Sequence, residues 1–349
     1  MLLITNSLIT NLLKNNTYMK RLLLMAVAIV ATLTASAQTA PERHGWEDIF
    51  PLHGNIQRVI IKKSMHEGRD GEFVLKYEDR TSYYEFNDAG NVIEINVFNS
   101  DESYAYYASY DYDARGRCVV ETKYYPACDE EKRNTFTYDL YGRLKEEYKY
   151  NNEGKLYQKT AYDYDMCGNK IRELVFYGDG SMQNRYEFTY GVNGKLVEEE
   201  QYDENGELDY QYIYTYNSEG NKTESTFYGN NYIESYTYTY DSKQRLTEQH
   251  HYEDGELKRR ITFNYDSSGR ETWVRCCNAN NEAMWSYKNT YDHHGNKIAV
   301  ESFNSKQVLH KTLTYMYDDH GNVIEIVEYL SNDEGITAEL KEYTIIYCE

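Results

Sequence analysis

Carboxylates are the residues in this sequence with the widest chemical scope, since 57 Asp and Glu stand against 37 Lys and Arg. Two carboxylates could serve as the acid and base of a glycoside hydrolase, yet no spacing singles out such a pair. We find no G-x-S-x-G, no H-E-x-x-H and no Gly-rich phosphate loop. The sequence therefore predicts a protein that is not an enzyme and needs no cofactor.

Metal binding is a second chemistry that the residue types suggest. His293, His294 and His320 occupy equivalent turns and could approach one another, which would suit weak binding of a transition metal. A ladder of turn aspartates offers one carboxylate per turn, whereas calcium needs several oxygen ligands at one point. Turn capping explains these aspartates without a metal, so we predict no metal site.

Six cysteines follow residue 100, and none of them forms a C-x-x-C pair. The spacing therefore gives no support for zinc, and it assigns no disulfide connectivity. They are Cys118, Cys128, Cys167, Cys276, Cys277 and Cys348.

Tyrosine dominates the aromatic residues, with 40 Tyr against 10 Phe and 3 Trp. Rings on one face of a sheet could stack on sugars, and the flanking polar side chains could bind hydroxyl groups. The alternative is that tyrosine pairs hold neighbouring strands together, at about 0.2 to 1 kcal/mol per pair. Strand alternation explains most positions, so we place a sugar platform on the aromatics beside the second turns of the repeats: Tyr202, Tyr228 and Tyr252.

These residues belong to a repeat that begins with an aromatic residue, Asp or Asn, two variable residues, and Gly. Its first aromatic recurs every 26 residues from 86 to 216, and then at 240, 265, 291 and 317. Asp can accept hydrogen bonds from the turn backbone, and Gly supplies the left-handed conformation that closes the turn. The copies with Tyr, Asp and Gly together include Tyr112-Asp113-Gly116, Tyr138-Asp139-Gly142, Tyr164-Asp165-Gly168, Tyr265-Asp266-Gly269, Tyr291-Asp292-Gly295 and Tyr317-Asp318-Gly321. Gln244 replaces the Gly in one copy.

A second turn follows each first aromatic by 12 or 13 residues, which leaves no room for crossover helices. Consecutive strands must then pair as an antiparallel meander. We predict an all-β fold, an elongated and twisted antiparallel meander of tandem hairpin repeats of about 26 residues over 86–349. Residues 53–85 read as a degenerate repeat that caps the N-terminal edge, because His53-Gly54-Asn55-Ile56 resembles a turn exit.

The first 37 residues have the pattern of a secretory signal peptide. Lys20 and Arg21 precede an apolar run, and cleavage is expected between Ala37 and Gln38. Met19 is an alternative start. Residues 38–52 form a short leader, no Cys follows the cleavage site for lipid attachment, and no later segment is apolar enough to span a bilayer. We expect a secreted or periplasmic protein.

Net charge limits the partners. The whole chain carries a formal charge of -20, and residues 38–349 retain all 57 acidic residues but only 34 basic ones. That field repels phosphate backbones and anionic membrane surfaces. Nucleic acid is therefore excluded as an expected partner, whereas a glycan or an envelope protein is compatible. The sequence does not indicate an oligomeric state.

Several strings resemble the YD repeats of the RHS family, including Tyr162-Asp163-Tyr164-Asp165 with Gly168, Phe136-Thr137-Tyr138-Asp139 with Gly142, and Phe263-Asn264-Tyr265-Asp266 with Gly269. MORN-type repeats are a neighbouring alternative. The RHS resemblance implies long β-sheet spirals, which in polymorphic toxins wrap into a shell and on cell surfaces are linked to ligand or carbohydrate binding. This chain is shorter than we expect a closed shell to need, and it has no non-repeat C-terminal toxin domain. We therefore predict an exported, non-catalytic binding or scaffold module at the envelope; the alternative is a component of an RHS-type toxin or secretion system.

Overall fold

The computed structural model describes residues 52–69, 72–229, 231–332 and 335–348. The described residues all belong to one compact unit, Gly45–Glu349. The predicted signal peptide, its cleavage site and the leader up to residue 51 lie outside the described residues.

The described residues form 22 strands and one short 3-10 turn. The strands are β1 (Ile56–Arg69), β2 (Glu72–Phe86), β3 (Val92–Asn99), β4 (Tyr104–Tyr112), β5 (Cys118–Tyr125), β6 (Glu130–Tyr138), β7 (Leu144–Tyr150), β8 (Leu156–Tyr164), β9 (Lys170–Tyr177), β10 (Met182–Tyr190), β11 (Leu196–Tyr202), β12 (Leu208–Tyr216), β13 (Lys222–Gly229), β14 (Tyr232–Tyr240), β15 (Leu246–Glu253), β16 (Glu256–Tyr265), β17 (Glu271–Asn278), β18 (Ala283–Tyr291), β19 (Lys297–Phe303), β20 (Leu309–Tyr317), β21 (Val323–Asn332) and β22 (Gly335–Tyr347). The 3-10 turn η2 (Pro126–Cys128) lies between β5 and β6.

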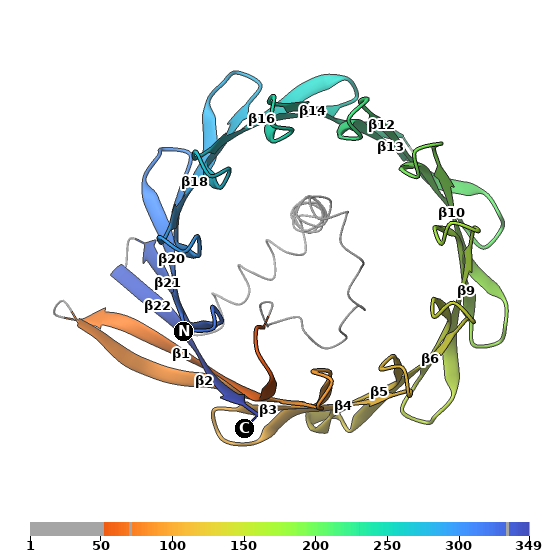
Figure 1. Cartoon of the computed structure of the whole chain (residues 1–349), viewed down its shortest axis with the longest axis horizontal. Coiled ribbons are helices and arrows are strands. Elements are labelled where there is room, and N and C mark those ends of the chain that lie inside the picture. The colour runs from red at the N-terminus through yellow and green to blue at the C-terminus, as the bar shows by residue number, and fades with distance from the viewer. Residues whose placement is uncertain (1–51, 70–71, 230, 333–334, 349) are drawn as a thin grey trace. The chain divides into compact units, whose positions relative to one another are not determined.

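Each strand pairs antiparallel with the next one in the chain, as the short turn spacing requires. The sheet then closes, because β1 also pairs antiparallel with β22, from Ile56 opposite Tyr347 to Glu67 opposite Thr337 (Figure 1). Closure removes the free edges that the first and last strands of an open meander would leave. We call the line of pairing between β1 and β22 the seam.

The predicted all-β antiparallel meander of hairpin repeats is confirmed. The meander also closes on itself, which the sequence analysis did not predict. Residues 53–85 supply β1 and most of β2, and β1 pairs with the last strand. Turns every 12 or 13 residues specify neighbouring pairs only, so repeat spacing alone could not predict that the ends meet.

The predicted turn chemistry is present in the repeats. In the copy at Asp113, the amide of Gly116 donates to the Asp113 carbonyl (2.9 Å), and the Asp113 amide donates to the Arg117 carbonyl (2.9 Å). Asp113 Oδ1 also accepts from the amides of Arg115 and Arg117. Gly116 has φ +76°, the left-handed conformation that Gly adopts without strain, and Gln244 adopts φ +64° in the copy without Gly.

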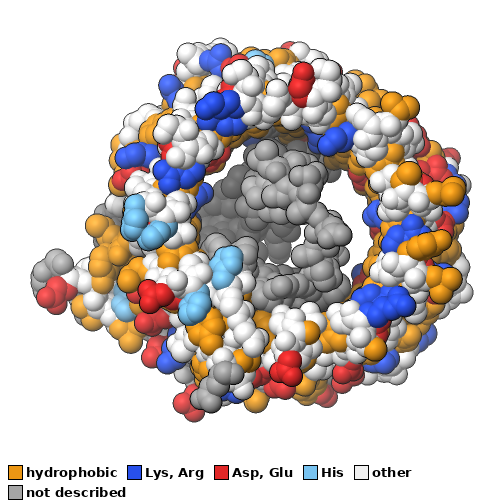
Figure 2. Space-filling view, in the orientation of Figure 1, with side chains coloured by type: hydrophobic (Ala, Val, Ile, Leu, Met, Phe, Trp, Pro, Cys, Tyr) orange, Lys and Arg blue, Asp and Glu red, His pale blue; other side chains and the backbone are white. Residues whose placement is uncertain are grey.

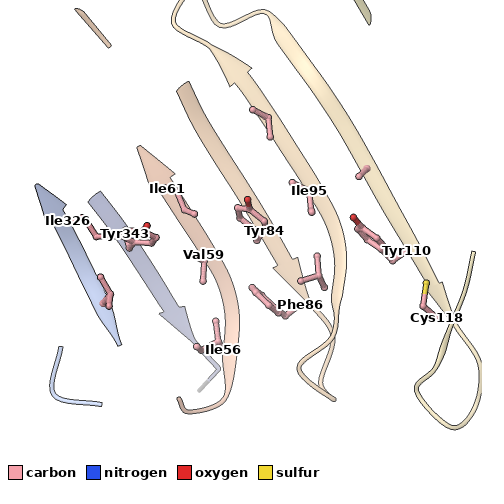
Figure 3. Close-up of a cluster of buried hydrophobic side chains, with 14 of the residues drawn as sticks. Ile56, Val59, Ile61, Tyr84, Phe86, Ile95, Tyr110, Cys118, Ile326 and Tyr343 are labelled. Atoms are coloured by element: carbon pink, nitrogen blue, oxygen red, sulfur yellow. The ribbon is translucent and has the colours of Figure 1, made fainter. Parts of the chain in front are cut away.

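The buried core lies on one face of the sheet. Val59, Tyr84, Ile95 and Ala108 are opposite one another on successive strands, so they share a face. Together with Val97 and Tyr110 they belong to a cluster centred on β1 to β4, β21 and β22 (Figure 3). The motif tyrosines lie on this same side, which we call the tyrosine face.

Candidate functional site

The motif tyrosines have a structural role in the repeat. The hydroxyl of Tyr112 donates to the Val92 carbonyl at 2.5 Å, so each motif tyrosine bonds back to the exit of the preceding motif turn. The same bond is formed by Tyr138, Tyr164, Tyr190, Tyr216, Tyr240, Tyr265, Tyr291 and Tyr317. Burial raises the pKa of Tyr240 to about 12. These hydroxyls are already used within the sheet.

The basic residue that ends a motif turn connects that turn to the next one. The Arg117 guanidinium lies 4.4 Å from the Tyr138 ring centroid, and Arg143 lies over Tyr164 at 4.6 Å. Arg117 also donates to the Asp113 carboxylate, which lowers the pKa of Asp113 to about 2. The turn aspartates therefore cap their own turns.

The three tyrosines predicted as a sugar platform lie in a row on the face opposite the tyrosine face. Tyr202, Tyr228 and Tyr252 belong to β11, β13 and β15, and the intervening strands separate successive rings by about 10 Å. Arg185 covers the Tyr202 ring at 4.1 Å, and the Tyr252 hydroxyl lies 3.3 Å from His250 Nδ1. Only Tyr228, at 41% exposure, presents an open ring. The structure brings these residues into one row without forming a joint surface.

A histidine that the sequence did not single out lies in a buried polar network on the tyrosine face. His251 Nε2 is 2.8 Å from Glu234 Oε1, and the Arg259 guanidinium donates to His251 Nδ1 (3.0 Å). Tyr236 donates to the same Glu234 oxygen and stacks on the imidazole. Arg259 therefore occupies Nδ1, and Nε2 faces the Glu234 carboxylate.

The described histidines and cysteines do not assemble a ligand set. His293 and His294 lie together (ring centroids 3.7 Å apart), whereas His320 packs against Tyr347. Among the described residues, no group of three or more His, Cys, Asp or Glu side chains is arranged to hold a metal ion. All six cysteines are free thiols. Burial raises the pKa of Cys118 to about 12 and that of Cys276 to about 11.

The sequence analysis missed one feature, the far part of the β1–β2 hairpin. β1 and β2 have 14 and 15 residues, and their hairpin projects beyond the wall formed by β3–β20 (Figure 1). β3 pairs with β2 only from Arg80 onward. Within the described part of the chain, no strand pairs with the other side of residues 72–79, which we call the docking edge.

Large apolar side chains line the docking edge. Phe73, Val74, Leu75 and Tyr77 are each between 43% and 51% exposed, and hydrophobic side chains are visible on the projecting hairpin in Figure 2. Phe73 packs its ring on Tyr329 of β21 at 5.4 Å. One sequence signal could have predicted this hairpin. Residues 56–69 contain no motif turn, although the 26-residue repeat predicts shorter strands.

Comparisons with known proteins leave the family unassigned. No family model matches the chain, and no curated protein matches it. Among solved structures, the Photorhabdus luminescens Tc holotoxin pore is similar over 73% of this chain and 17% of its own, at 11% identity and a TM-score of 0.39. The TcdB2-TccC3-Cdc42 complex matches over 80% of this chain and 21% of its own, at 13% identity and a TM-score of 0.22.

A porin-like protein from Bacteroides uniformis is similar over 84% of this chain and 99% of its own, at 10% identity and a TM-score of 0.31. This chain thus spans about a fifth of the toxin chains that it resembles. At these scores none of the likenesses assigns a function. In the described residues, no helix has the length and hydropathy that crossing a membrane requires.

Proposed function

We propose that this chain is an exported, non-catalytic scaffold at the cell envelope that binds a partner protein through the docking edge. The observation that carries the proposal is the unpaired backbone of residues 72–79 beside exposed Phe73, Val74 and Leu75. A row of unpaired N–H and C=O groups is a template for another strand. The partner would add an extended segment to β2.

The acidic charge of the docking edge indicates which kind of partner segment it would bind. The docking edge carries Glu72, Glu78 and Asp79 against the single cation Lys76, which is itself 3.7 Å from Glu67. The whole chain is also strongly acidic. We therefore expect an extended segment with alternating apolar residues flanked by Lys or Arg.

A second copy of this chain fits the docking edge poorly. An antiparallel pair about a two-fold axis at Leu75 would set Glu72 opposite Glu78 of the other copy, at both ends of the pairing. Like charges directly opposite one another destabilise a sheet.

A displayed library of ten-residue peptides, selected on the full chain, tests the proposal. We expect selected peptides to alternate apolar residues and to carry basic ends. Leu75→Lys should weaken their binding by tenfold or more, because a charge on the edge strand opposes strand addition. Ile213→Lys is the matched control, since Ile213 is an exposed apolar residue on the doubly paired strand β12.

Peptides that bind the Leu75→Lys variant as tightly as the unaltered chain would overturn the proposal, as would a selection that enriches nothing. A concentration-dependent dimer that Leu75→Lys abolishes would replace the partner with a second copy. Retention on a glycan array that is lost in Tyr228→Ala would favour the sugar platform instead.

A further inference from the structure

The two sides of the seam carry complementary pieces of the repeat motif. The last residues of the chain read Tyr347-Cys348-Glu349, and the first described strand is preceded by His53-Gly54-Asn55. Read in that order, they have the length of one motif turn. The preceding turn, Tyr317-Asp318-Asp319-His320-Gly321-Asn322, ends in the same three residue types.

The seam has one backbone hydrogen bond and the left-handed Gly of the motif, whereas the Tyr347 hydroxyl donates to Asp318 Oδ2 (2.5 Å). The Cys348 amide donates to the Asn55 carbonyl at 2.9 Å, which matches the bond from Asp318 to the Asn322 carbonyl in the preceding turn. Gly54 has φ +93°, close to the +83° of Gly321. A Cβ added to Gly54 would lie 2.9 Å from the Tyr347 ring, so Gly is required there for contact as well as for conformation.

The contact from one turn to the next is also preserved across the seam. Elsewhere a turn-ending side chain packs on the next motif tyrosine and bonds to the next turn, as Arg143 does with Tyr164 and the Asp165 carbonyl. At the seam, fully buried Asn322 donates to the Tyr347 hydroxyl (2.7 Å) and to the His53 carbonyl (2.9 Å). The His53 amide donates a hydrogen bond to Asn322 Oδ1 (2.6 Å).

We propose that Tyr347-Cys348 and His53-Gly54-Asn55 are the two halves of one split repeat turn, and that β22 is the latch that closes the sheet by completing it. Every other motif turn is held by an unbroken backbone, whereas this one is held only by side-chain and backbone hydrogen bonds. The latch requires no binding partner, so this proposal does not depend on partner binding at the docking edge.

Paired variants of the full chain test the latch. Asn322→Ala should lower the thermal unfolding midpoint by about 3–6 °C, because it leaves the His53 and Tyr347 groups unsatisfied. Asn296→Ala is the control, since Asn296 holds the same place in the preceding motif turn and its side chain bonds only to Asp292 within that turn. The control should shift the midpoint by less than half as much. Equal shifts would overturn the latch.

A circular permutant tests the split turn itself. Glu349 is joined directly to His53, and new ends are opened between Val192 and Asn193, in a motif turn where Val192 is fully exposed. We expect this protein to keep the far-UV spectrum of the unpermuted 53–349 chain and to unfold at a higher temperature, because the joined turn removes chain entropy from the unfolded state.

A second permutant, joined through two added glycines, should lose most of that gain, since the motif has a fixed length. A directly joined permutant that fails to fold while a twelve-residue linker rescues it would show that the ends do not form a motif turn. If all the permutants fail, the opened turn at residue 192 is at fault, and the Asn322 and Asn296 pair decides the question.

Discussion

The wall of β3–β20 and the seam region of β21, β22, β1 and β2 use the same motif for different purposes. In the wall, strands of 7 to 10 residues alternate regularly with turns. In the seam region, β22, β1 and β2 reach 13 to 15 residues and carry both the closing contacts and the docking edge. The repeats build a uniform wall, and departures from the repeat lie where the sheet closes and where β2 has a free side.

The tyrosine face shows the same contrast in its packing. Two residues before the motif aromatic, most strands that contain it carry another aromatic residue. Near the seam the residue opposite it is apolar, as with Ile95 opposite Tyr84 and Ile326 opposite Tyr315. On alternate strands from β5 to β11 this place is taken by glutamate, four times in succession: Glu121, Glu147, Glu173 and Glu199. The seam therefore has an apolar core, whereas these wall strands place carboxylates opposite aromatic rings.

The largest effect should come from removing a ring in the seam core. Tyr84 is 2% exposed and packs among Val59 and Ile95, so Tyr84→Ala should cost about 3–5 kcal/mol of unfolding free energy, measured by urea titration. The matched wall variant is Tyr162→Ala, at the same place in its repeat, where partial exposure should limit the cost to about 1–2 kcal/mol. Equal losses would abolish the distinction between the two regions.

A smaller effect should come from the glutamates of the wall. Burial raises the pKa of Glu199, so the folded state binds this proton more readily than the unfolded state does. Stability should then fall as pH rises above the ordinary value of 4.5, and Glu199→Gln should remove that slope and add about 0.5–1 kcal/mol at pH 7. Denaturant titrations between pH 4 and 7 measure how the free energy of unfolding depends on pH. The control is Glu207→Gln, an exposed turn residue, and a slope that survives Glu199→Gln would contradict the assignment.

The smallest effect should come from repairing the one motif turn without Gly. Gln244 holds φ +64°, which disfavours a residue with a side chain, and its side chain bonds to Asn221 in the preceding turn. Gln244→Gly removes the backbone strain but also the bond to Asn221. The net effect should be to raise the free energy of unfolding by about 0.5–1 kcal/mol. The reverse change, Gly269→Gln in the next turn, should lose a similar amount. A destabilised Gln244→Gly would mean that contact between turns outweighs backbone strain in the wall.

The sequence by itself determined the local structure, because each turn and each pairing of neighbouring strands depends on residues close together in the chain. Asp113 and Gly116 fix a turn through bonds to their own backbone, and 12-residue spacing forces neighbouring strands to pair. The same alternation could place Tyr202, Tyr228 and Tyr252 in a row. It could not show that Arg185 covers one of those rings, because that contact depends on how two strands align.

Only the tertiary structure decided that the sheet closes. Two segments resemble parts of the motif in sequence, His53-Gly54-Asn55 and Tyr347-Cys348. Their pairing depends on twist and curvature accumulated over twenty intervening strands. The free side of residues 72–79 has the same origin. The missing turn between residues 56 and 69 indicates long strands, but whether a strand has a neighbour on its far side is a property of the assembled sheet.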